Sequence, residues 1–433
     1  MIGFAAVEAV QPKLTDMPER LRAAAVQVGG TLGALGYQAW VVGGAVRDLA
    51  IGRVVGDVDI TTDASPDAVE SAFPQTVPLG KRFGTVLVKL SGLGLEVTTL
   101  RAEGGYKDNR RPDQVQFGTS VEEDATRRDF TCNAMYLDTE SGDFLDPVHG
   151  LDDLEAGVLR AVGDASVRFS EDGLRIFRLA RFAAVLGLDP APETLEGARA
   201  SLASLQGVSA ERILAELGRG LTCERGDVML ELLSDLGVHA RLYPEAIASA
   251  GSDSVSIARS LPCPLELVPG LLLFVDPDPL DHGSAGRRAR TELALAGLEA
   301  LKPSKELRMK ATSTWGLCCE LEAWCGDGAA DGQVRRWMQE DGWERASALA
   351  VACARARGED PLELEQWREA KAAMTEDELF PDPWVDADLL RESGCPPGPR
   401  WRELMDAGLL KQLGGDWDAK SDAEAWLRQQ LER

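Results

Sequence analysis

The chain has 433 residues, of which 44% are hydrophobic, and its formal net charge is −25. This length exceeds what one hydrophobic core usually organises, so we expect two to four domains. The acidic balance excludes a generally basic surface, so any contact with a nucleic acid must use local patches of Lys and Arg.

The composition also bears on location. No run of 18 apolar residues occurs, which predicts no membrane span. The first fifteen residues have neither the charged start nor the cleavage pattern of a signal peptide. The eight cysteines form no CxxC pair and there are only three histidines, so a zinc cage is not expected. These features predict a cytoplasmic protein with reduced cysteines.

The predicted elements divide the chain near residue 150. Before it, strands are expected at 38–42, 57–62, 85–90, 95–100 and 133–138, and helices at about 17–35, 45–51, 66–73 and 121–128. After it, helical periodicity dominates, as in 171–187, 209–222, 226–237 and 285–301. The sequence therefore predicts a small domain of strands and helices, followed by a helical remainder.

The most informative segment is GGAVRDLAIGRVVGDVDI at 43–60, where a glycine turn, a short helix and a second turn lead to Asp57 and Asp59. Residues i and i+2 of a strand share one face, so the two carboxylates should lie together. Their repulsion disappears if a hard divalent cation binds between them. The simpler interpretation of the two acids is a solvated strand end.

Two interpretations of Glu96, in the predicted strand 95–100, are equally open. It is either a third carboxylate of the same metal site or an exposed strand residue. A metal ion held by two or three carboxylates and by substrate phosphates is the usual way in which proteins bind Mg²⁺.

Arg127 and Arg128 stand at the end of a predicted helix, just before a strand. Two guanidinium groups in that position suit the oxygens of a triphosphate, which they can contact in a planar, bidentate way. The alternative is that they stabilise the C-terminus of the helix with positive charge.

The segment EDGLRIFRLARF at 171–182 is predicted to be a helix that opens with acids and carries arginines at three-residue steps. Such a pattern stabilises any helix. Asp172 and Arg175 also suit a nucleobase, because a carboxylate accepts from an exocyclic amine and a guanidinium donates to an adjacent ring atom. Cytosine and adenine present that edge, whereas uracil and guanine do not.

The motifs GGAVRD, DVD, FGTV, RRDFTCNA, DPVHGLDDL, EDGLRIFRLARFAA and SAERI occur in this order. The chain thereby resembles the tRNA nucleotidyltransferase and bacterial poly(A) polymerase family, within the polymerase-β-like nucleotidyltransferases. The resemblance is dense from about 36 to 222, thin through the middle, and faint at VDADLLRESGCPPGPRWREL.

The resemblance implies an α+β fold: a small N-terminal mixed-sheet nucleotidyltransferase head followed by an all-α neck, body and tail. The expected boundaries are 1–148 for the head, 149–222 for the neck with the nucleotide-recognition helix, 223–325 for the body and 326–433 for the tail.

The resemblance also implies site residues. Asp57 and Asp59 match the catalytic metal pair. The nucleotide-binding positions are Gly44, Arg47, Arg128, Asp172, Arg175, Arg178 and Arg181, with Asp172 and Arg175 choosing the base. The implied activity is template-independent addition of C, C and A to the 3′ end of tRNA from CTP and ATP, with Mg²⁺ as cofactor and release of pyrophosphate.

Two details favour CCA addition within the family. The segment 79–85 ends Phe83-Gly84-Thr85, as in the tRNA enzymes, although its Gly-Lys-Arg-Phe resembles the polymerase signature. The segment 101–117 resembles the flexible loop of enzymes that add the final A. The alternatives are an A-adding tRNA enzyme, a poly(A) polymerase, or a non-catalytic RNA-binding protein that retains the fold. The intact pair Asp57 and Asp59 argues against the last.

Overall fold

The computed structural model describes residues 8–80, 84–106, 112–117, 120–242, 252–275, 292, 294–327 and 331–432. The chain forms two compact units, residues 1–247 and residues 248–433. Lys107, Arg110 and Arg111, which with Arg101 make up one of the local basic patches that the sequence offers, lie outside the described residues, as do Lys81, Arg82 and Phe83.

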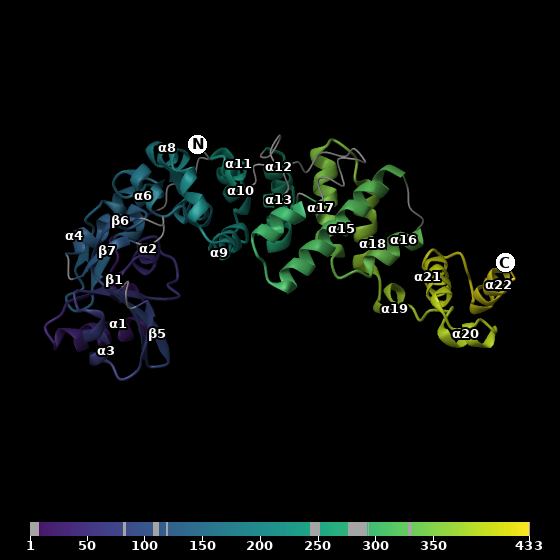
Figure 1. The fold of residues 1–433 in the computed structure, drawn as a ribbon, viewed down its shortest axis with the longest axis horizontal. Helices are drawn as coiled ribbons and strands as arrows, with labels where there is room; N and C mark the ends of the chain where they lie inside the picture. Colours follow the sequence, from purple (N-terminus) through teal and green to yellow (C-terminus); the bar gives the residue numbers. More distant parts are fainter. Residues whose placement is uncertain are drawn as a thin grey trace. The chain divides into compact units, whose positions relative to one another are not determined.

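A seven-stranded mixed sheet organises the start of the first unit (Figure 1). Its strands, in spatial order, are β3 (Thr76–Gly80), β4 (Thr85–Leu90), β5 (Leu93–Thr99), β2 (Asp59–Thr62), β1 (Ala39–Val42), β8 (Tyr136–Asp138) and β9 (Phe144–Leu145). The central pair β2 and β5 is parallel, and the other neighbours are antiparallel. The predicted mixed sheet is confirmed.

Four helices accompany these strands: α1 (Glu19–Gly33), α2 (Gly44–Ala50), α3 (Pro66–Ala72) and α4 (Val121–Thr126). Val41, Ile60 and Val97, on three adjacent strands, are fully buried. A second apolar cluster joins Trp40 and Tyr136 of the sheet to Val121 and Ala125 of α4. The sheet therefore provides a rigid base for the loops at its ends.

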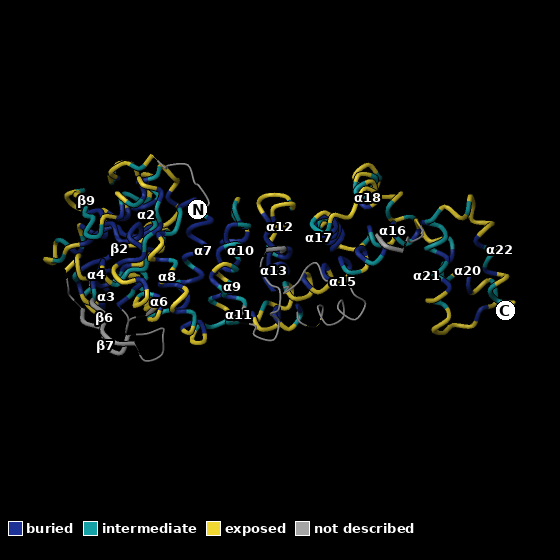
Figure 2. The backbone as a smooth tube through the Cα atoms, turned by 90° about the horizontal axis from the view of Figure 1, so that it is seen from above, coloured by how far each residue is buried: buried dark blue, intermediate teal, exposed yellow. Residues whose placement is uncertain are grey.

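After β9, the described part of the first unit is mainly helical, with a small parallel pair of strands, β10 (Val158–Leu159) and β11 (Asp189–Pro190). Its helices are α5 (Gly150–Glu155), α6 (Ala165–Glu171), α7 (Leu174–Leu186), α8 (Pro192–Ala200), α9 (Ala210–Leu221), α10 (Gly226–Asp235) and α11 (Val238–Leu242), with short 3-10 turns η3 (Thr131–Asn133) and η4 (Leu202–Gly207). Helix α7 packs against α9 and α10 and is buried over most of its length (Figure 2).

Helices and the segments that connect them make up the described residues of the second unit, which contain no strand. Its helices are α12 (Ser252–Ser260), α13 (Leu267–Val275), α15 (Lys305–Asp327), α16 (Asp331–Met338), α17 (Trp343–Ala356), α18 (Leu362–Ala373), α19 (Glu376–Leu379), α20 (Ala387–Glu392), α21 (Pro399–Leu413) and α22 (Lys420–Leu431). Trp315 and Trp343 are buried, and Trp384 stacks on Trp417 near the end of the chain. Within the described residues, no helix is both long and apolar enough to cross a membrane.

Three expectations from the sequence were wrong in detail. The helix expected from residue 171 begins at Leu174, because Asp172 is extended and ends α6. The strand expected from residue 133 begins at Tyr136, because Asn133 belongs to a 3-10 turn. The segment 101–117, expected to be a flexible loop, contains the paired strands β6 (Arg101–Tyr106) and β7 (Pro112–Phe117). The four-part division into head, neck, body and tail stays a prediction.

Candidate active site

Asp57 and Asp59 lie on one side of the extended chain that leads into β2, which begins at Asp59. Asp57 and Asp59 are exposed, whereas Val58 and Ile60 between and beside them are buried. This is the alternation expected of a strand with one covered face. Asp59 stands opposite Glu96 in the parallel register of β2 and β5, so both acids lie at the same level of the sheet.

The electrostatics of Asp59 reflect this crowding. Desolvation by the surrounding protein, followed by repulsion from Glu96 and Asp57, raises its pKa to about 6, while Arg128 acts in the opposite direction. Among the described residues, no group of three or more His, Cys, Asp or Glu side chains is arranged to hold a metal ion. Glu96 as a third ligand therefore stays a prediction, and Asp57 with Asp59 is the better supported pair.

The glycine turn and α2 lie beside this acidic pair in the sequence. Gly43 has φ +74°, a backbone conformation that favours glycine, and a Cβ there would lie 3.7 Å from Nη1 of Arg128. A Cβ at Gly44 would lie 3.6 Å from Nη2 of Arg47. Arg47 is 8% exposed. It donates from Nη2 to Asp48 (2.8 Å) and from Nη1 to Oδ1 of Asn133 (2.7 Å).

Arg127 and Arg128 share an acid of their own helix. Asp124, which is fully buried, accepts from Nε of Arg127 (2.7 Å) and from Nη2 of Arg128 (2.9 Å). The hydroxyl of Tyr136 also donates to Asp124 (2.9 Å), and the Arg128 guanidinium lies 5.1 Å from the centre of the Tyr136 ring. Burial would raise the pKa of Asp124, but Arg128 and Arg127 hold it below its usual value.

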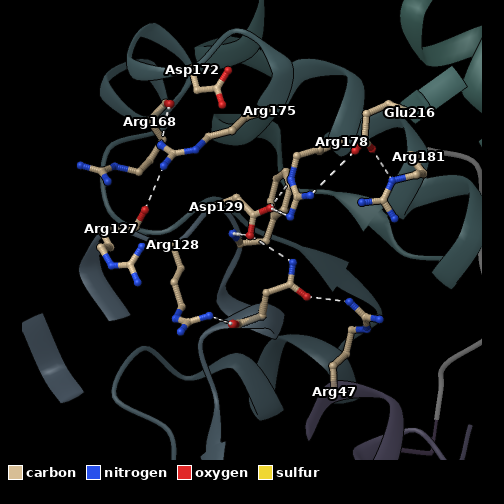
Figure 3. Close-up of polar contacts among 12 residues, drawn as sticks. Arg47, Arg127, Arg128, Asp129, Arg168, Asp172, Arg175, Arg178, Arg181 and Glu216 are labelled. Atoms are coloured by element: carbon tan, nitrogen blue, oxygen red, sulfur yellow. Dashed lines mark hydrogen bonds and ion pairs between the residues drawn. The ribbon is translucent and has the colours of Figure 1, made fainter. Parts of the chain in front are cut away.

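Asp172 and Arg175 have different partners. Arg212 of α9 donates to both oxygens of Asp172, at 2.6 and 3.3 Å, and the N–H of Leu174 donates to Oδ1 (3.0 Å). Arg175 donates to Glu171 (2.7 Å) and to the backbone oxygen of Arg127 (2.9 Å). Asp172 and Arg175 therefore lie at the junction of α6 and α7 instead of on one helix face. Figure 3 shows the contacts of Arg175 with the backbone oxygens of Arg168 and Arg127.

The two remaining arginines of α7 pair with buried acids. Arg178 donates from Nε to Oδ2 of Asp129 (2.7 Å), and Arg181 pairs with Glu216 of α9 (Figure 3). Burial would raise the pKa of Asp129, but Arg178, a hydrogen bond from Asn133 and then Arg175 lower it to about 2. Burial lowers the pKa of Arg181, and Glu216 partly offsets this effect. Each predicted site residue from 128 to 181 thus has an oppositely charged partner, and these ion pairs fall into separate groups.

Sequence reasoning missed the partners that position these arginines. They are Asp124, Asp129, Asn133, Phe182, Arg212 and Glu216. The sequence contained one signal: Glu216 falls on the apolar stripe of α9 between Ile213, Leu217 and Gly220, where an acid needs a buried cation. Asp129 and Asn133 carry no such signal, because their contacts depend on how the chain folds back.

Comparison with known proteins agrees with this geometry. The Poly A polymerase head domain matches residues 39–160, and the family described as a probable RNA and SrmB-binding site of polymerase A matches residues 187–249. The first unit therefore contains a nucleotidyltransferase head domain, followed by a segment that matches an RNA-binding family.

Relatives with curated names are similar over part of the chain. The CCA-adding enzyme of Bacillus pumilus is 45% identical over 224 residues, which are 51% of this chain and 54% of that protein. The CCA-adding enzyme of Geobacillus stearothermophilus is 44% identical over 207 residues, or 48% of this chain and 51% of that protein. The chain spans about half the length of the curated relatives that it matches.

Solved structures are similar over nearly the whole chain. The Bacillus stearothermophilus CCA-adding enzyme in complex with CTP has a TM-score of 0.67 and 29% identity, and the match covers 96% of this chain and 98% of that one. The Thermotoga maritima CCA-adding enzyme complexed with tRNA shares the fold, with a TM-score of 0.71, 17% identity, and coverage of 96% and 97%. Residues 39–160 thus match the Poly A polymerase head domain, and the chain shares the fold of the CCA-adding enzymes.

Proposed function

We propose that this protein adds C, C and A to the 3′ end of tRNA from CTP and ATP and releases pyrophosphate. The observation that carries the proposal is structural. The acidic strand β2 and the segment around Asp172 and Arg175 belong to one compact unit. Arg128 lowers the pKa of Asp59 and shares Asp124 with Arg127, and Arg175 donates to the backbone oxygen of Arg127. The names of the curated relatives support the same activity.

Asp57 and Asp59 fit a divalent cation. Carboxylate oxygens are the ligands that Mg²⁺ prefers. Desolvation, and then the negative charges of Glu96 and Asp57, raise the pKa of Asp59, and a bound cation would offset both effects. A bound Mg²⁺ would supply charge neutralisation around the α-phosphate and the leaving pyrophosphate. We propose Asp57 and Asp59 as its ligands, with Glu96 as a candidate third.

Arginines of the site would bind the triphosphate. Arg47 and Arg128 are anchored by acids or amides on one side of their guanidinium groups, and Arg178 and Arg181 are anchored by Asp129 and Glu216. A guanidinium has five N–H donors in a rigid planar fork, so an anchored arginine can still donate to phosphate oxygens. Because these groups are held before the nucleotide arrives, little conformational entropy is lost on binding.

Asp172 and Arg175 would choose the base. An ionised carboxylate only accepts hydrogen bonds, so Asp172 suits the exocyclic amine of cytosine or adenine and disfavours the carbonyl of uracil or guanine. The protein contacts of Arg175 use three of its five N–H donors. The remainder can donate to the ring nitrogen beside the amine. This arrangement selects C and A without a nucleic-acid template.

The head-domain match to Poly A polymerase favours a second candidate function, in which the protein adds only A. An A-adding tRNA enzyme or a poly(A) polymerase would use the same chemistry with a different outcome. The division of labour between a head at 1–148, a neck at 149–222, a body at 223–325 and a tail at 326–433 belongs to the proposal, as does a cytoplasmic location, where tRNA and nucleotides are available.

Incorporation of labelled nucleotides tests the proposal. Purified protein is incubated with Mg²⁺ and a tRNA transcript that ends before CCA, with CTP alone, ATP alone or both. Extension by three nucleotides with both present, and by two with CTP alone, is expected. Incorporation from ATP alone, or long homopolymers on unrelated RNA, would establish the second product, and no extension under any condition would reject both.

A further inference from the structure

Asn133 connects Arg47 of α2 with Asp129, the partner of Arg178 on α7. It lies in the turn η3 and is 5% exposed. Its Oδ1 accepts from Nη1 of Arg47 (2.7 Å), and its Nδ2 donates to Oδ1 of Asp129 (3.1 Å). The other oxygen of Asp129 accepts from Nε of Arg178 (2.7 Å). We call this chain of four residues, from Arg47 through Asn133 and Asp129 to Arg178, the amide bridge.

The chemistry of the amide bridge requires an amide at its centre. Arg47 can only donate and ionised Asp129 can only accept, so the residue between them must accept on one side and donate on the other. Rotating the Asn133 amide by half a turn would place N–H against N–H and oxygen against oxygen. The orientation of this side chain is therefore fixed by its two neighbours.

A second contact joins the same two arginines. The guanidinium carbons of Arg47 and Arg178 lie 5.2 and 5.1 Å from the centre of the Phe182 ring, and that of Arg181 lies 3.9 Å from it. Phe182 is buried, at 5% exposure. Each distance is within the range of a cation–π interaction. Arg47 of α2 and Arg178 of α7 are thus held at a defined separation by a hydrogen-bonded path and by a shared aromatic ring.

We propose that Asn133 is a positioning residue, which fixes Arg47 of α2 relative to Arg178 of α7 so that both engage one nucleotide together. This inference rests on the proposed function. Asn133 does not contact the base-reading residues Asp172 and Arg175 through any bond described above. Its loss therefore weakens binding of CTP and ATP equally and leaves the choice between bases unchanged.

Two substitutions separate the two bonds of Asn133. N133A removes both. N133D has nearly the same shape and still accepts from Arg47, but it cannot donate and places a second carboxylate beside Asp129. If anchoring Arg47 were sufficient, N133D would behave as wild type. The amide bridge predicts instead that both variants lose about 10- to 100-fold in affinity for Mg·CTP and Mg·ATP, the range for one hydrogen bond to a charged group.

A matched control lies in the same turn. Thr131 is also buried, at 3% exposure, and donates to Asp153 (2.8 Å), which pairs with Arg160 and not with Arg47 or Arg178. T131V perturbs the packing of η3 without touching the amide bridge, so nucleotide affinity within about twofold of wild type is expected. An equal loss in T131V and N133A would overturn the proposal, because it would indicate general loosening of the turn.

The deciding experiment is a double-mutant cycle in the full chain. Affinities for Mg·CTP, Mg·ATP and Mg·UTP are measured by titration calorimetry for wild type, R47A, N133A and R47A/N133A, with KM, kcat and the melting temperature alongside. If Asn133 acts through Arg47, N133A lowers the nucleotide affinity by less than about threefold in the R47A background. An undiminished cost there, or an altered ratio of UTP to CTP affinity, would overturn the proposal.

The readouts separate this inference from the proposed function. Nucleotide affinity does not require turnover, so a wild-type protein that binds CTP but extends no tRNA would contradict the proposed function and still test Asn133. If N133A does not fold, N133D in the same cycle supplies the result, because it preserves the volume of the side chain. A wild-type protein that binds no nucleotide would reject both.

Discussion

Replacing Asp124 by Asn is expected to destabilise the first unit strongly. Asp124 has no exposed surface. It accepts from Nε of Arg127, from Nε and Nη2 of Arg128, and from the hydroxyl of Tyr136, at 2.7, 3.1, 2.9 and 2.9 Å. An asparagine keeps one acceptor oxygen and turns an amide donor toward the arginines. It also removes the negative charge that, among these contacts, balances the positive charges of Arg127 and Arg128.

The size of the effect follows from the burial of the group. Breaking a buried ion pair by removing one partner costs about 3–5 kcal/mol, because the other charge is left unpaired. Arg127 and Arg128 keep only 15% and 16% of their side-chain surface exposed, so water replaces little of what is lost. We expect D124N to lower the free energy of unfolding of the first unit by about 3–5 kcal/mol.

Hydrogen exchange monitored by mass spectrometry suits this measurement, because peptides from residues 120–138 report on the first unit separately from the second. Glu19 offers a matched control in the same unit, since its ion pair with Arg22 is largely exposed. E19Q should change the opening free energy by less than about 1 kcal/mol. A D124N variant as stable as E19Q would refute the argument from buried charge.

Three further predictions concern the acids of the site. Asp129, with its pKa lowered from 3.8 to about 2, contributes about 2 kcal/mol of stability above pH 4 that is lost as the pH falls from about 4 to 2. Urea unfolding across this range should show a smaller loss in D129N, and equal losses would contradict the ion pair with Arg178. D57A should abolish incorporation of CTP and ATP with a melting temperature within about 2 °C of wild type; wild-type rates would remove Asp57 from the metal site. D172A should relax the preference for C and A more than it weakens nucleotide binding, and unchanged incorporation of UTP relative to CTP would contradict the base-reading role.

Local patterns in the sequence predicted most elements of the first unit. Alternating apolar residues located β1, β2, β4 and β5, and Asp57 and Asp59, which alternate with buried Val58 and Ile60, were correctly expected on one face. The edge strand β3 was missed, because Pro78 lies within it and edge strands need no alternating core face. The start of α7 was misplaced, because the helical period continues through Glu171 and Asp172 although Gly173 separates two helices.

The sequence singled out the candidate site residues, which stay a prediction, but it did not indicate their contacts. Asp172 was expected to lie beside Arg175, three positions away, yet its partner Arg212 is 40 positions away. Arg47 and Asn133 are separated by 86 positions, and Arg181 and Glu216 by 35. Periodicity describes one element at a time, so pairs brought together by the return of the chain leave no local pattern.

The pairing of Arg181 with Glu216 has a consequence for how such proteins diverge. Glu216 lies within the segment that matches the RNA-binding family, residues 187–249, whereas its partner precedes that segment. A chimera in which a foreign helical domain replaces the residues after 186 would leave the buried guanidinium of Arg181 without its acid. The foreign domain would have to supply an acid at the position of Glu216. Substitutions at Arg181 and at Glu216 must therefore occur together. A chimera joined after α9 should be tolerated better than one joined before it.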